Sequence, residues 1–175
     1  AKAADDLVKA KYSCYFKYFS SIRIKAAKAK TVKGKDLEPV VLDVFNQWLE
    51  IGKEDVFKNK IGQRRFVLWY TNFIDDLPIT ALESNLENIC QNIGKDSWAD
   101  HLIKANFYIK KGWMHRGSGY ANEVTEDGWK SFRECLREAV VHAKAAALIT
   151  PEYPEPYLIM IKASMSEPDK TRIRI

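Results

Sequence analysis

The chain has 175 residues, of which 46% are hydrophobic and 12% aromatic, so it is long enough to bury a core of its own. The formal net charge is +5, and it is concentrated at one end: residues 1–35 contain ten lysines and arginines but only two aspartates. A surface that coats nucleic acid usually carries basic residues across its main face. No apolar run approaches the roughly 18 residues that a membrane span requires. The composition therefore disfavours both a membrane-spanning protein and a nucleic-acid-coating protein.

Helical spacing begins in the basic N-terminal region. Apolar residues from Val8 to Ala29 recur at alternating intervals of four and three, which predicts one amphipathic helix over residues 4–31. Its lysines can form a solvated face, contact nucleic acid or lie on a membrane surface. Because the apolar stripe needs neighbouring helices to bury it, we expect a structural helix and no specific nucleic-acid partner.

Three helices are predicted in the middle of the chain, over residues 37–51, 60–76 and 80–93. Asp36 can cap the first of them, and Gly52 can end it. Thr80 and Glu83 form a capping box that would open the third, which Gly94 closes. Apolar residues at helical spacing give each of these helices one face to bury.

Three more helices are predicted towards the C-terminus, over residues 97–115, 126–149 and 155–165. Ser97 or Asp96 can cap the first and Thr125 the second. Residues 139–165 place an alanine-rich helix, a Pro-x-x-Pro turn and a new helix in succession, as at a junction between tetratricopeptide repeats. A regular 34-residue period is absent elsewhere.

Strand signals are poor, because β-branched residues seldom alternate with polar ones. We therefore predict an all-α protein, an irregular tetratricopeptide-like array of antiparallel helical hairpins. The whole chain, 1–175, is predicted to form a single helical domain. Its expected parts are a basic helix and loop (1–35), helical hairpins (36–95), a tetratricopeptide-like part (96–165) and a tail (166–175).

The stretch "KGWMHRGSGYANEVTEDGW", residues 111–129, and the helix after it resemble a bacterial family known as domain of unknown function 4034. The residues that carry the resemblance are Trp113, Arg116, Gly117, Gly119, Tyr120, Ala121, Val124, Trp129, Phe132, Leu136, Ala139, Ala143, Ala146, Pro151 and Pro154. It covers about residues 96–165 and implies a tetratricopeptide-like helical fold and a bacterial origin. It implies no reaction.

This stretch has two interpretations. As a corner between helices, it would bury Trp113 and Trp129 in the core, while Arg116 hydrogen-bonds carbonyls left free at a helix end. As a binding site, it would hold an anionic group with His115, Arg116 and Tyr120 lining a groove. We keep these five residues as the candidate binding site.

Chemistry-bearing motifs are scarce. There is no Walker loop, dinucleotide fingerprint or nucleophile elbow, and the cysteines Cys14, Cys90 and Cys135 are predicted to be buried free thiols. The histidines, at positions 101, 115 and 142, are far apart in sequence and have no metal-ligand spacing. His142 is expected to be a packed or surface residue. We therefore predict no catalytic residues, no metal and no cofactor.

The leading hypothesis is a non-catalytic bacterial protein-interaction module that docks a protein partner in a groove between stacked helices. Trp48 and Trp69 are candidate anchors, although core positions explain each ring as well. A toxin-neutralising immunity protein is one specific version. The alternative is a small-ligand binder or enzyme centred on the corner from Trp113 to Tyr120. The compartment, bacterial cytoplasm or periplasm, stays open.

Overall fold

The computed structural model describes residue 46, residues 60–74 and residues 79–166. Within these residues the regular secondary structure is entirely α-helical, which confirms the predicted all-α class. The predicted helices over 4–31 and 37–51 lie outside the described residues. So do the basic lysines, Cys14, Trp48 and the side chain of Trp69.

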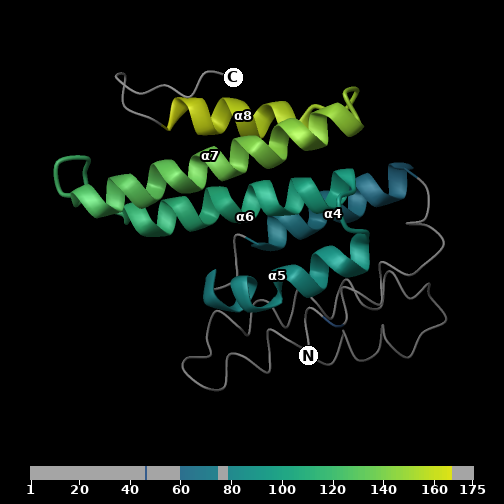
Figure 1. The fold of residues 1–175 in the computed structure, drawn as a ribbon, viewed down its shortest axis with the longest axis horizontal. Coiled ribbons are helices and arrows are strands. Elements are labelled where there is room, and N and C mark those ends of the chain that lie inside the picture. The colour runs from purple at the N-terminus through teal and green to yellow at the C-terminus, as the bar shows by residue number, and fades with distance from the viewer. Residues whose placement is uncertain (1–45, 47–59, 75–78, 167–175) are drawn as a thin grey trace, which may run out of the picture. The chain divides into compact units, whose positions relative to one another are not determined.

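The described helices are α4 (Lys60–Ile74), α5 (Ile79–Ile93), α6 (Trp98–Arg116), α7 (Glu126–Ile149) and α8 (Glu155–Met165), as Figure 1 shows. Those last two have the predicted bounds, and the other three differ from prediction by one or two residues. Because α5 already includes Ile79, Thr80 lies inside its first turn and not at the N-cap position predicted for it.

Side-chain caps fix the starts of α6 and α7. Ser97 Oγ accepts a hydrogen bond from the Asp100 N–H at 3.2 Å, and Thr125 Oγ1 accepts one from the Gly128 N–H at 3.1 Å. Each cap satisfies a backbone donor that the first helical turn leaves free. Gly94, at φ 110°, occupies a backbone conformation that favours glycine and ends α5 where predicted.

The chain divides into two compact units, residues 1–92 and residues 93–175. In the first unit, α4 and α5 bury Val67, Tyr70, Leu82, Ile89 and Cys90. The second unit contains α6, α7 and α8. The division falls between residues 92 and 93, and the predicted tetratricopeptide-like part, from residue 96, stays a prediction.

In the second unit, α7 lies between α6 and α8 (Figure 1). Residues near the connecting loop on α6 contact residues near it on α7, as in the Trp113–Phe132 ring contact. Farther from the loop, His101 contacts His142, so the two helices are antiparallel. The core between the helices contains small, aliphatic and aromatic side chains, and Phe132, Leu136, Ala139, Ala143 and Ala146 are fully buried.

Gly112 allows α6 to approach α7 closely. It lies inside α6, within the predicted range 97–115, and is buried. A Cβ atom at this position would lie 3.2 Å from both the Cβ of Cys135 and a ring carbon of Phe132. The glycine therefore serves helix packing, and Gly117, at φ 77°, is the residue that ends the helix.

Candidate functional site

Arg116, the last residue of α6, is the centre of the predicted corner. Its Nη1 donates hydrogen bonds of 3.1 Å to the carbonyl oxygens of both Gly117 and Gly119. Its guanidinium carbon also lies 5.3 Å from the ring centroid of Trp113 and 5.2 Å from that of Trp129. A guanidinium between two indoles, tied to two loop carbonyls, holds the loop against both helices.

The two tryptophans of the corner are not core residues, contrary to prediction. Trp113 is 41% exposed and Trp129 is half-buried. Phe132 is fully buried, and both indoles meet its ring edge-to-face, at centroid distances of 5.1 and 5.8 Å. The indoles cover this phenylalanine from outside because they also cover the Arg116 guanidinium, which keeps them at the surface.

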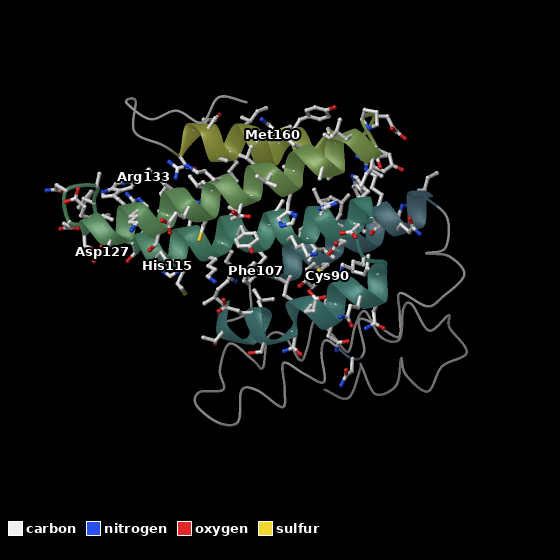
Figure 2. The ribbon with its side chains drawn as sticks, in the orientation of Figure 1. Cys90, Phe107, His115, Asp127, Arg133 and Met160 are labelled. Atoms are coloured by element: carbon white, nitrogen blue, oxygen red, sulfur yellow. The ribbon has the colours of Figure 1, made fainter. Side chains whose placement is uncertain are left out.

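The remaining predicted site residues do not join Arg116. His115 is exposed, and Tyr120 is 80% exposed. The Tyr120 backbone N–H donates a 2.7 Å hydrogen bond to Glu123 Oε2, which closes a turn in the loop. Figure 2 labels His115 near the end of α6 and Asp127 in the first turn of α7, on either side of this loop. The structure therefore unites Trp113, Arg116 and Trp129 but not His115 and Tyr120.

A histidine pair that sequence reasoning missed lies between α6 and α7. The Nδ1 atoms of His101 and His142 are 3.1 Å apart, although the sequence separates these residues widely. Tyr108 stacks on the His142 ring at 5.7 Å with an interplanar angle of 10°. The only available signal in the sequence was that antiparallel pairing of α6 with α7 places His101 and His142 opposite each other.

Asp100 lies next to this pair in sequence and is fully buried. Its Oδ2 accepts a 3.0 Å ion-pair contact from Lys104 Nζ and a 2.9 Å hydrogen bond from the Asp96 N–H. These contacts tie the carboxylate to the first turn of α6, where negative charge stabilises the helix dipole. Among the described residues, no group of three or more His, Cys, Asp or Glu side chains could hold a metal ion.

The third feature is α8, which has apolar rows on two opposite sides, with Glu155 and Lys162 between them. Pro156, Ile159, Met160 and Ala163 are its buried residues, and Figure 2 labels Met160 on this helix. A second row is exposed: Tyr157 (41%), Leu158 (60%), Ile161 (49%) and Met165 (80%). These four positions lie on one side of a helix with 3.6 residues per turn, opposite the buried row. We call them the outward row of α8.

Two further observations bear on the nature of the chain. No helix among the described residues is long and apolar enough to cross a membrane. Comparison with protein-family models, with curated proteins and with solved structures gives no match. The resemblance to the domain-of-unknown-function family and the tetratricopeptide-like arrangement therefore stay predictions.

Proposed function

We propose that this protein is a non-catalytic protein-interaction module that binds an amphipathic helix of a partner protein on the outward row of α8. The observation that supports it is the exposed apolar row itself. An apolar row on a helix is normally buried against a neighbouring element. Here Leu158 and Met165 are mainly exposed while Ile159 and Met160 are covered. Such a helix is suited to a position between two other elements, and a bound partner would cover its exposed side.

The spacing of the outward row favours a helix as the occupant. Tyr157, Ile161 and Met165 follow each other at intervals of four, which gives the ridge that packs into the groove of a neighbouring helix. The row is just over two turns long, or roughly 12 Å, which matches a short amphipathic helix. Leu148, near the end of α7, is 85% exposed and adds apolar surface beside the turn into α8.

The corner supports this assignment by its own contacts. The Arg116 guanidinium already has two carbonyl acceptors and two aromatic faces. An arginine held in this way has a structural role, which weakens the alternative of a small-ligand site or an enzyme centred on Trp113 and Tyr120. A toxin-neutralising immunity protein is the narrower form of the proposal, and the identity of a captured partner tests it.

The experiment is quantitative capture of partners from cells of the native organism on immobilised protein, comparing wild type with the double variant Leu158→Glu/Ile161→Glu. Both substitutions are on exposed positions, so the melting temperature should stay within about 2 °C of wild type. Recovery of the specific partner should fall at least tenfold. The matched control is Arg137→Glu, an exposed position on α7 that changes the net charge by the same amount.

Two results would refute the proposal. Partner recovery that the double variant leaves unchanged would remove the outward row from the interface. A wild-type dimer in light scattering that becomes a monomer in the double variant would show that the row binds a second copy of the chain.

A further inference from the structure

His101 and His142 meet end to end across α6 and α7. Their ring centroids are 5.4 Å apart, which is about equal to the 3.1 Å between the Nδ1 atoms plus the two ring radii. The two nitrogens therefore point at each other, as a hydrogen bond requires. Ligands of one metal ion would converge on a point beside the line that joins them. The geometry thus favours a shared hydrogen over a shared metal.

Such a pair tolerates one donor only. One Nδ1 must carry the hydrogen, and the other must keep its lone pair free to accept it. A single added proton leaves this arrangement intact, because a doubly protonated ring can still donate. A second added proton places two N–H groups and two positive charges face to face, and the hydrogen bond is lost.

The surroundings of His142 oppose this second proton. Partial burial lowers the pKa of His142 below its ordinary value of 6.5, and positive charge on His101 and Lys104 of α6 lowers it further. Asp100 on α6 and Glu138 on α7 act in the opposite direction, with smaller effect. A lowered folded-state pKa means that the unfolded chain binds the proton more readily, so folding stability falls as the pH drops below about 6.5.

We propose that His101 and His142 form a proton-operated clasp, a hydrogen bond that joins α6 to α7 at neutral pH and is lost in acidic solution when the accepting Nδ1 binds a proton. The clasp is independent of the proposed partner-binding function. Because α8 packs on α7, loss of the hydrogen bond between the two histidines would also weaken the packing that supports the outward row. The Tyr108 ring, stacked on His142, holds the imidazole plane in place for the hydrogen bond.

The first test uses nuclear magnetic resonance on the wild-type protein with ¹⁵N-labelled histidine. A hydrogen bond from nitrogen to nitrogen transmits a scalar coupling between the two Nδ1 nuclei. We expect this coupling at pH 7.5 and its loss on titration towards pH 5. Its absence at pH 7.5 would overturn the clasp without any need for a variant.

The second test measures melting temperatures at pH 7.5 and pH 5 for the wild type, His101→Asn, His142→Asn and the double variant. Asparagine places an amide near the Nδ1 position but does not titrate. The wild-type melting temperature should fall by about 3 °C or more beyond the fall in each variant. Either substitution alone removes the clasp. The pH dependence of the melting temperature in the double variant should therefore be no smaller than in the single variants.

His115→Asn is the matched control, since this exposed histidine lies on the same helix and should leave the wild-type pH dependence in place. Equal pH dependence in the wild type and His142→Asn would overturn the proposal. So would a rise in melting temperature on addition of Zn²⁺ that His142→Asn abolishes, because it would assign the pair to a metal ion.

Discussion

At the scale of single residues, the corner between α6 and α7 shows how one charged side chain changes the burial of its neighbours. Arg116 has to keep its guanidinium near solvent, and Trp113 and Trp129 face it. The apolar core therefore ends at Phe132, and the indoles form its cover. Aromatic residues beside an arginine thus sit at the rim of a core more readily than at its centre.

This difference in burial between Phe132 and the indoles predicts unequal losses of folding stability for two aromatic substitutions. Phe132→Ala should lower the free energy of unfolding by about 3–5 kcal/mol, because it removes a fully buried ring. Trp113→Ala should cost only about 1–2 kcal/mol, because the indole is already 41% exposed. Urea denaturation of both variants measures the difference. Equal losses would show that Trp113 is a core residue after all.

Arg116→Lys tests the role of the guanidinium itself. Lysine keeps the positive charge but cannot present a planar group to two indoles and two carbonyls. Since these contacts are partly exposed, we expect a loss of about 1–2 kcal/mol and a melting temperature lower by roughly 3–6 °C. Partner affinity should not change. An unchanged melting temperature together with lost binding would make Arg116 a recognition residue.

At the scale of helices, local rules predict α7 and α8 well and fail where two helices meet. Thr125 and the proline-rich turn are local signals, and the bounds of α7 and α8 follow from them. The role of Gly112 and the pairing of His101 with His142 depend on the register between α6 and α7. No single helix encodes that register, so periodicity alone could not reveal either feature.

The close approach at Gly112 gives an element-scale prediction. In Gly112→Val, the new side chain would meet Cys135 and Phe132, whose atoms lie 3.2 Å from the Cβ position. Overpacking of this kind typically costs about 1–3 kcal/mol, so thermal unfolding should occur at a lower temperature. Valine has a higher helix propensity than glycine, so a loss in Gly112→Val would come from the clash, whereas Glu134→Val places valine at an exposed position of α7 without a clash. A similar loss in both variants would refute close packing at Gly112.

At the scale of the whole molecule, the apolar pattern of α8 has the widest consequence. The sequence predicts where this helix begins and ends, but its string of apolar residues is also compatible with complete burial. The packing of α8 against α7 and α6 separates Ile159 and Met160, which are covered, from Leu158 and Met165, which are exposed. The predicted binding residues at the corner and the outward row are therefore different surfaces. The corner was identified from the sequence, whereas the outward row was identified only from the three-dimensional arrangement.

Site-specific photo-crosslinking in living cells tests this central claim most directly. A photoreactive phenylalanine analogue replaces Ile161 in the outward row, and in a parallel strain it replaces Arg137, which is exposed on α7. Our account predicts a covalent adduct of discrete mass from position 161 and none from position 137. Absence of an adduct at position 161, or equal adducts from both positions, would contradict it.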